Sequence, residues 1–307
     1  MNHICRSIKE IMMHRMRKIP HLVTLSVLVA ILSVAYAAIE DIPEKNEKQE
    51  EQGKKYGGFT NTPKQPDGKW RVHDPNRPQP PVAEPKYDGK PVKAPEGAKI
   101  LFDGTNTDQW KRKNWPVKDG VMIAGKSQQE TLEKFGDIYL HIEWMIPRGD
   151  TLHKMKRNQW NQKQGNSGVF LMKRYEIQVL NGWANRTYPD GMVGAIYGQT
   201  PPLVNACRKP GEWNAYDIHF KAPVFAEDGK VKEEAYMTAY LNGVLVQDNT
   251  RIWGPTSWRK VAKYNKPHGK DVIQLQWHGN KVRYRNIWVA PLKKKLGPDG
   301  EKEQDKK

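Results

Sequence analysis

Between Ala98 and Pro291 the chain consists of short stretches in which apolar and polar residues alternate. A repeat of two places successive side chains on opposite faces of a β-strand, so each stretch has one apolar face to bury. Turn-forming Gly, Pro, Asn and Asp separate the stretches, and no helical stripe of comparable length occurs there. The clearest stretches are 138–146, 175–180, 216–220, 236–241, 273–278 and 282–289. Many antiparallel strands in one domain most simply form two packed sheets, so the pattern predicts an all-β sandwich or jelly roll.

The longest apolar segment, from Leu22 to Ile39, follows a cluster of basic residues and contains the small-x-small sequence Ala35-Tyr36-Ala37. This order is typical of a secretory signal peptide. We therefore expect residues 1–37 to be a signal and the protein to be exported, to the periplasm or out of the cell. The segment also just reaches the length of a membrane span. Its retention as an anchor is the alternative, and it is the only membrane association that the sequence suggests.

Residues 38–96 differ in composition from the domain that follows. A run rich in Glu, Lys and Gln up to Lys55 predicts a disordered tether. The many prolines between Tyr56 and Glu96 exclude a helix and most sheet interiors, and so predict an extended, Pro-rich segment. The sequence Trp70-Arg71-Val72-His73-Asp74 within it is unlike a plain linker and suggests an ordered strap across the domain. We expect the domain itself over 97–291 and a charged, flexible tail over 292–307.

Composition and short motifs exclude several classes of function. The 307 residues carry a formal net charge of +17, but Lys and Arg are dispersed and no nucleic-acid-binding motif accompanies them. We attribute the charge to solubility and expect no nucleic-acid partner. No Gly-x-Gly-x-x-Gly motif follows a predicted strand, so no nucleotide cofactor is expected. If Cys5 leaves with the signal, Cys207 has no partner for an intramolecular disulfide.

Polar side chains with catalytic chemistry lie on the non-core faces of several predicted strands. In 175–180 the alternation turns Glu176 and Gln178 away from the core, and in 273–278 it does the same for Gln276 and His278. Glu143 and Arg285 occupy equivalent positions in two other stretches. Carboxylates, amides, an imidazole and a guanidinium can together hold a polyhydroxylated ligand and move protons on it. We therefore expect these groups to meet in one sugar-binding hollow.

Each of these residues also has a purely structural interpretation. Glu143 and Arg285 could form an ordinary cross-strand ion pair, and His278 lies at a strand end where a solvated histidine is common. Most tryptophans are expected in the core. Those in loop-like stretches, whose rings could stack on a sugar, are Trp160, Trp183, Trp253 and Trp258.

Seven short motifs follow one another along the predicted domain. They are Leu101–Gly104 with Trp110, Gly165–Leu171, Tyr175–Leu180, Gly194–Gln199, Pro210–Asn214, Leu241–Val244, and Leu275–Gly279 followed by Arg285–Ile287. In this order they resemble the 3-keto-disaccharide hydrolase family, which includes 3-keto-glucoside lyases and hydratases. The resemblance covers about Ala98 to Pro291 and implies a concanavalin A-like jelly roll. It also implies substrate-binding roles for Asn166, Tyr197 and Trp213, beside Gln178 and Gln276. Trp277 stands where many members carry an acidic residue.

The spacing Glu176-x-Gln178-x-x-Asn181 lacks the second carboxylate that jelly-roll endoglucanases place on this strand as Glu-x-Asp-x-x-Glu. The 3-keto substrate implied by the resemblance offers another route, because its carbonyl acidifies the C2 proton and allows elimination at C1 followed by hydration. This route predicts Glu176 or His278 as base, Arg285 and Gln178 as donors to the enolate and hydroxyls, and Glu143 as acid or orienting group. A divalent metal held by His278 and a carboxylate could replace Arg285.

The expected ligand is an oxidised sugar or glycan, made by a separate sugar 3-dehydrogenase because this chain has no nucleotide motif. Two alternatives compete with the enzyme. One is a non-catalytic glycan-binding jelly roll tethered at the cell envelope. The other is a structural envelope protein whose basic charge binds an anionic polymer.

Overall fold

The computed structural model describes residues 57–148 and 162–292. The expected signal peptide, the tether up to residue 56 and the tail from residue 293 lie outside this part of the chain. Within the two described ranges, no helix has the length and apolar character needed to cross a membrane.

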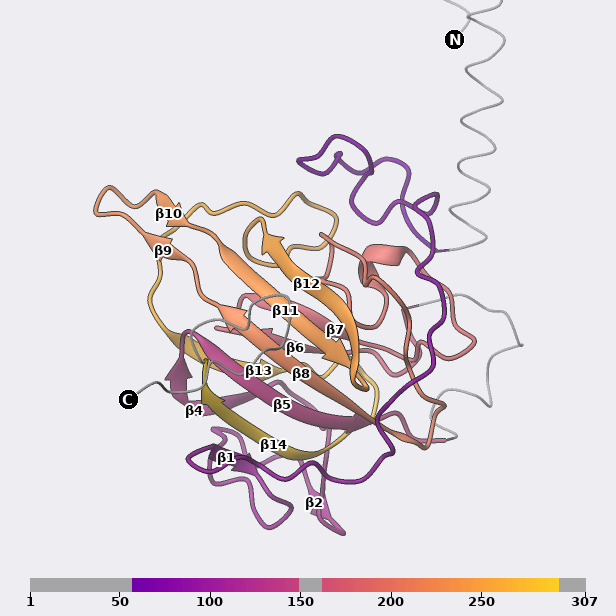
Figure 1. Ribbon diagram of the computed structural model, residues 1–307, viewed down its shortest axis with the longest axis vertical. Coiled ribbons are helices and arrows are strands. Elements are labelled where there is room, and N and C mark those ends of the chain that lie inside the picture. Colours follow the sequence, from indigo (N-terminus) through magenta and orange to yellow (C-terminus); the bar gives the residue numbers. More distant parts are fainter. Residues whose placement is uncertain (1–56, 149–161, 293–307) are drawn as a thin grey trace, which may run out of the picture. The chain divides into compact units, whose positions relative to one another are not determined.

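Two antiparallel sheets form the domain (Figure 1). The larger has eight strands, in the order β12 (Val244–Ile252), β11 (Ala235–Leu241), β8 (Trp213–Lys221), β5 (Ile138–Met145), β14 (Arg283–Pro291), β3 (Val121–Ile123) and β2 (Val117–Lys118), with β1 (Lys99–Phe102) paired to β14. The smaller has the order β4 (Gln129–Phe135), β13 (Asp271–Leu275), β6 (Ser167–Leu171) and β7 (Tyr175–Val179). A separate ribbon pairs β9 (Val224–Phe225) with β10 (Val231–Glu233). The only helix in the described ranges is one 3-10 turn, η2 (Pro189–Gly191).

The core lies between the two sheets, as the alternation predicted. Ile142 and Trp144 of β5 and Val169 and Ile177 of β6 and β7 belong to one buried cluster. The Tyr216 hydroxyl of β8 donates to the Gln178 carbonyl of β7 at 2.6 Å, which ties the sheets together across this core. The prediction of an all-β jelly-roll sandwich is therefore confirmed.

The outer face of the four-stranded sheet departs from simple alternation. All five residues of β7 are buried, including Glu176 and Gln178, which point away from the core. They are buried because loops cover this face. Tyr188, Thr256 and Trp258 from these loops line one pocket with Glu176 and Gln178. The loop with Tyr188 is held at the edge of β7, where Gly194 N–H donates to the Gln178 carbonyl at 3.0 Å and Tyr197 N–H to the Glu176 carbonyl at 3.1 Å. A loop cover over a polar sheet face creates an enclosed, polar space.

The Pro-rich segment runs along the domain without joining either sheet, and Figure 1 shows it as the indigo and purple chain that passes down one side. The segment forms its own turns first, where Val72 N–H donates to the Pro63 carbonyl at 3.0 Å. Farther along, Asn205 N–H donates to the Pro81 carbonyl at 2.8 Å, and Val92 N–H donates to a Glu143 carboxylate oxygen at 2.9 Å. We call residues 57–96 the strap.

Candidate functional site

A pocket of about 510 Å³ opens on the outer face of the four-stranded sheet. Strands β6 and β7, the end of β13 and the covering loops all contribute to it. Its size suits a sugar ring and a substituent. The lining residues are Gln162, Asn166, Phe170, Glu176, Gln178, Tyr188, Tyr197, Thr256, Trp258, Gln276 and His278.

Six of the predicted site residues meet in this pocket. Glu176 and Gln178 project from β7, and Gln276 and His278 follow β13, whose end is bonded to β6 by Gln276 N–H donating to the Gly168 carbonyl at 2.9 Å. Asn166 and Tyr197 complete the set. His278 is exposed at the pocket's edge, whereas Glu176 and Gln178 lie beneath it.

The expectation that Glu143, Arg285 and Trp213 share this hollow is wrong. They lie on β5, β14 and β8 of the eight-stranded sheet, whose polar face points away from the four-stranded sheet. Arg285 Nε donates to Glu143 Oε2 at 2.6 Å, and the guanidinium stacks over the Trp213 ring at 4.0 Å. The structural interpretation of this ion pair is therefore the right one.

This ion pair anchors the strap. Glu143 accepts Val92 N–H, and Arg285 Nη2 donates to the Gly89 carbonyl at 2.6 Å. Burial alone would raise the pKa of Glu143, but hydrogen bonds from His141, Asn286, Val92 and Arg285 together lower it to about 2. A carboxylate held ionised in this way cannot serve as a general acid near neutral pH.

Glu176 has the opposite electrostatic environment. Its side chain is 4% exposed, and burial raises its pKa to about 8. Gly168, on the neighbouring strand β6, makes room for it. A Cβ at position 168 would lie 2.3 Å from Glu176 Oε1, so any side chain there would displace the carboxyl. The glycine in the Asn166-Ser167-Gly168 sequence is therefore a requirement of the site.

Two amide oxygens in the pocket have no donor within the described part of the chain. They are Gln178 Oε1 and Gln276 Oε1, and both are buried. Gln178 Nε2 donates to Gln162 Oε1 at 2.9 Å and to the Gly191 carbonyl at 3.3 Å, which fixes the orientation of its amide. Gln178 therefore offers an acceptor to a ligand, not the donor that the sequence predicted. Unsatisfied buried acceptors favour a ligand that brings hydroxyl groups.

Tyr188 and Tyr197 supply a donor. Their hydroxyls lie 2.8 Å apart, and burial raises the pKa of both, so both stay protonated. One hydroxyl donates to the other, which leaves the proton of the accepting hydroxyl free to bind a ligand. Glu176 lines the same pocket as both tyrosines, and its charge acts on both of them.

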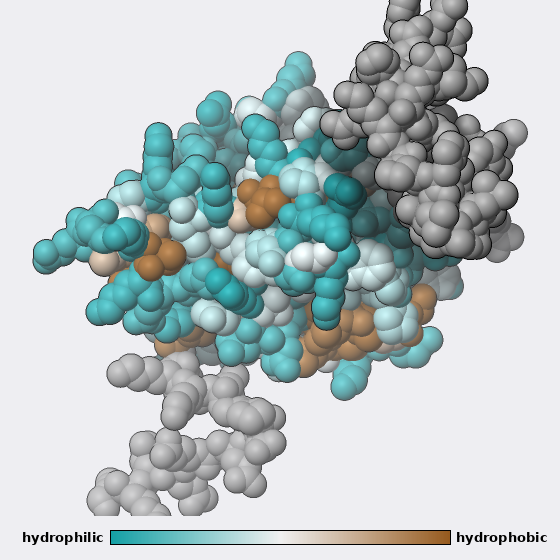
Figure 2. Space-filling model, turned by 90° about the horizontal axis from the view of Figure 1, so that it is seen from above, coloured by the Kyte–Doolittle hydropathy of each residue, from teal (hydrophilic) through white to brown (hydrophobic). Residues whose placement is uncertain are grey.

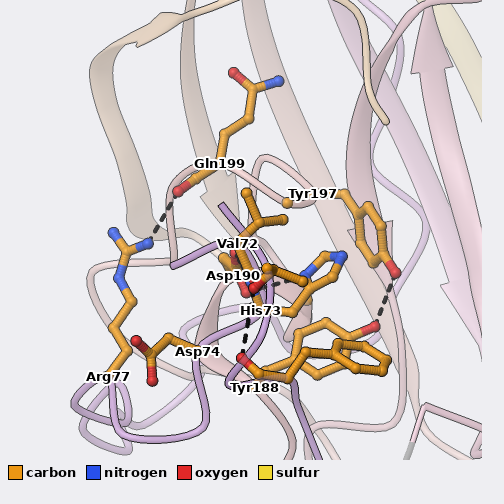
Figure 3. Close-up of polar contacts among 12 residues, drawn as sticks. Val72, His73, Asp74, Arg77, Tyr188, Asp190, Tyr197 and Gln199 are labelled. Carbon is orange, nitrogen blue, oxygen red and sulfur yellow. Dashed lines mark hydrogen bonds and ion pairs between the residues drawn. The ribbon is translucent and has the colours of Figure 1, made fainter. Parts of the chain in front are cut away.

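Most of the pocket residues on the loops that cover the four-stranded sheet were not predicted from the sequence. Tyr188, Gln162 and Thr256 come from loops without periodicity, and His73 with Asp190 lies directly behind the tyrosines (Figure 3). The non-linker composition around His73 was a signal, but it did not indicate what the residue contacts. The loop position of Trp258 did suggest a role in stacking.

The metal alternative involves His278 and one carboxylate. His278 and Glu176 line the same pocket. In 57–148 and 162–292, no group of three or more His, Cys, Asp or Glu side chains has an arrangement that could hold a metal ion.

Comparisons with known proteins identify the family of the domain. Residues 97–290 match the family model described as a 3-keto-alpha-glucoside-1,2-lyase-like domain. Among solved structures, a candidate glycosyl hydrolase from Parabacteroides distasonis is 40% identical, with a TM-score of 0.62 over 70% of this chain and 93% of its own. Two further candidate glycosyl hydrolases from that organism are 20% and 23% identical, with TM-scores of 0.45 and 0.43. They cover 66% and 64% of this chain and are themselves matched over their whole lengths.

None of the curated proteins compared with the chain matches it. The family match spans more than half of the sequence, and the first of the solved structures adds substantial identity over nearly its full length. The family match includes the strands that form the pocket. The chain therefore belongs to the family of 3-keto-alpha-glucoside-1,2-lyase-like domains and is related to carbohydrate-active enzymes.

Proposed function

We propose that this protein cleaves 3-keto-glycosides by elimination across C1 and C2 followed by hydration. The observation that supports the proposal is a buried carboxyl, Glu176, which shares a sugar-sized pocket with two amide oxygens that have no donor among the described residues. A single carboxyl does not support double displacement, which needs two carboxylates flanking one bond. It is sufficient for a reaction that begins with removal of a C–H proton.

Glu176 is the base in this mechanism. Its raised pKa makes the ionised carboxylate a stronger base than an ordinary glutamate, and it is matched to a pH near 8. The carboxylate takes the C2 proton, the C2–H electrons delocalise onto the C3 carbonyl oxygen, and the resulting enolate expels the C1 oxygen. Loss of the C1 substituent lets water enter, and the carboxyl proton of Glu176 exchanges with this water. Water then adds at C1 and gives up a proton to His278, while Glu176 delivers its solvent-derived proton to C2, which completes a net hydrolysis.

The other pocket groups provide the hydrogen bonds. The free hydroxyl proton of the Tyr188–Tyr197 pair stabilises the developing charge on the C3 oxygen, the role first expected of Arg285. His278, at the pocket's edge, protonates the departing oxygen. Gln178 and Gln276 accept bonds from sugar hydroxyls through their free oxygens.

The sequence supports the wider setting of this activity. The segment 1–37 supports export, and the chain's lack of a dinucleotide motif supports a separate dehydrogenase that makes the 3-keto sugar. Amino-terminal sequencing of the protein recovered from the periplasm and the medium tests the first of these. A mature chain that begins at Ala38 is the expected result.

Incubation of the purified mature chain with a 3-keto-glucoside, with and without a chelator, tests the activity. We expect aglycone release above the buffer control, and we expect Glu176→Gln to lower it on the order of a hundredfold or more. Glu233→Gln, which removes a surface carboxylate paired with Lys221 at 2.7 Å, is the matched control and should leave the rate unchanged. If the chelator abolishes aglycone release while Glu176→Gln does not lower it, the result would instead support a metal held by His278.

A glycan-binding module is the second candidate, and Trp258 favours it. This ring lines the pocket but is 61% exposed, as expected of a platform on which a sugar face stacks. Such a module would bind the unoxidised glycoside as tightly as the 3-keto form and would release no aglycone. Calorimetric titration with both sugars separates the two functions.

A further inference from the structure

His73, in the strap, combines two unfavourable features. Its backbone has a φ of 58°, and its ring is fully buried with an Nε2 that has no hydrogen-bond partner within the described ranges. Left-handed backbone is strained for a residue other than glycine, and an orphaned buried nitrogen loses its hydration without compensation. His73 also lies outside the matched domain of 97–290, and the proposed reaction does not use it. Such a group needs a structural explanation.

Asp190 sets the orientation of the His73 ring. Asp190 Oδ2 accepts the His73 backbone N–H at 2.8 Å, and Oδ1 lies 3.2 Å from Nδ1. Because an ionised carboxylate only accepts hydrogen bonds, Nδ1 carries a proton and Nε2 lies on the far side of the ring. Figure 3 shows the ring extending from Asp190 toward Tyr197.

The oriented ring packs against both pocket tyrosines. Its centroid lies 4.2 Å from that of Tyr188 and 5.1 Å from that of Tyr197. Figure 3 shows the hydrogen bond between the tyrosine hydroxyls on the side of these rings away from Asp190. His73 is therefore a support packed against the tyrosine pair that shares the pocket with Glu176.

The strap also holds the loop that carries these tyrosines. Gln65 Nε2 donates to the Gly198 carbonyl at 2.7 Å, and Arg77 Nη1 donates to the Gln199 carbonyl at 3.0 Å. At the other end of the loop, Gln79 Nε2 donates to the Thr187 carbonyl at 2.8 Å. These bonds on both sides of His73 fix the loop to the strap.

We propose that His73 is a positioning residue of the pocket, which, held by Asp190, keeps the Tyr188–Tyr197 pair closed over Glu176. The strap outside the family domain thereby completes the site. The closed pair excludes water from the carboxyl, and this dryness maintains its proton affinity. The proposal rests on the proposed function for the purpose of the pocket, but its structural claim can be tested without catalysis.

The test follows the protonation of Glu176 in the full chain. Infrared difference spectra against Glu176→Gln identify the carbonyl band of the protonated carboxyl, and its loss with pH gives a midpoint. Other titratable groups that line the pocket are Tyr188, Tyr197 and His278, with Asp190 behind the tyrosines. Only the Glu176 band disappears in the reference variant, so the midpoint belongs to Glu176.

His73→Asn is the test variant, because its amide can still donate to Asp190 while the supporting ring is lost. We expect water to reach Glu176 and the midpoint to fall from about 8 by roughly one unit toward the ordinary value. His219→Asn is the matched control. It removes an imidazole that stacks on Tyr139 at 4.5 Å on the eight-stranded sheet and should leave the midpoint unchanged.

With a 3-keto-glucoside, His73→Asn should lower kcat about tenfold and change KM less than about twofold, as expected of lost positioning. An unchanged midpoint and an unchanged kcat in the folded variant would overturn the proposal. If His73→Asn does not fold, Asp190→Asn replaces it as the test variant, because it keeps the side-chain shape but weakens the hydrogen bonds to His73. We expect the Glu176 midpoint to fall in Asp190→Asn as well, and an unchanged midpoint in this variant would also overturn the proposal. If the wild-type protein has no activity but His73→Asn still shifts the Glu176 midpoint, only the proposed function is contradicted.

Discussion

Burial has opposite consequences for two of the buried carboxyl groups, Glu143 and Glu176. Glu143 has cationic and N–H partners that hold it ionised, whereas burial of Glu176 favours its protonated form. Their sequence contexts are similar, since each is a glutamate on the polar face of an alternating strand. The difference arises from the neighbours, because Arg285 faces Glu143 across strands while Phe170 and Gly168 surround Glu176.

The Glu176 carboxyl should make stability depend on pH. Its pKa is about 8 in the folded chain against an ordinary value of 4.5, so the native state binds one more proton than the unfolded state between these values. The free energy of unfolding should then fall with rising pH by up to about 1.4 kcal/mol per unit across this window, relative to Glu176→Gln. Urea unfolding of both proteins over the window measures this, and parallel curves would show that Glu176 is not buried.

Gly168→Ala should remove activity by displacing the Glu176 carboxyl. The added Cβ would overlap Oε1 at 2.3 Å and Phe170 Cε2 at 2.9 Å, so we also expect a loss of about 1–3 kcal/mol in stability. Gly269→Ala is the matched control, since nothing lies within 4 Å of a Cβ there. Aglycone release and urea unfolding report both effects, and a fully active Gly168→Ala protein would contradict the placement of Glu176.

At the scale of strands, alternation located the polar faces but could not assign them to sheets. A period of two tells which residues avoid the core, and Glu143, Glu176, Gln178 and Arg285 all satisfy it. A sandwich has two such faces, and the strand order decides which one a residue joins. Strands β5 and β14 are neighbours in the eight-stranded sheet, whereas β7 is an end strand of the other.

Glu143→Gln should therefore weaken strap docking without impairing chemistry. The amide loses its charge-assisted bond to Arg285, so we expect a loss of roughly 1.5–3 kcal/mol in unfolding free energy. Hydrogen exchange at the Val92 amide, which donates to Glu143, should become faster. A large fall in kcat with unchanged stability would show instead that Glu143 reaches the substrate.

At the scale of the whole molecule, the pocket exists because segments distant in sequence cover one sheet. Figure 2 shows a mostly hydrophilic surface with separate hydrophobic patches. The strand pattern predicted the sandwich and four pocket residues, and the motifs added Asn166 and Tyr197, since both signals are local features. The roles of His73 and Tyr188 could not be predicted from the sequence, because they depend on how irregular loops pack against each other. No periodicity records such packing.

Trp258, whose exposed ring lies at the edge of the pocket, is expected to bind the sugar by stacking. Trp258→Ala should raise KM for a 3-keto-glucoside several-fold with little change in kcat, since stacking on the ring is equal in ground and transition states. Trp183→Ala removes another exposed tryptophan, 45% accessible and not part of the pocket lining, and should leave KM unchanged. Equal effects of the two substitutions would argue against Trp258 as a platform.

Deuterium labelling tests most directly whether Glu176 removes the C2 proton. The reaction is run in D2O with a 3-keto-glucoside, and the product is examined by NMR against a time-matched buffer control. We expect one solvent deuterium at C2 of every product sugar, formed at a rate that falls with Glu176→Gln. A product that retains its original C2 hydrogen, or labelling that is unchanged in Glu176→Gln, would contradict it.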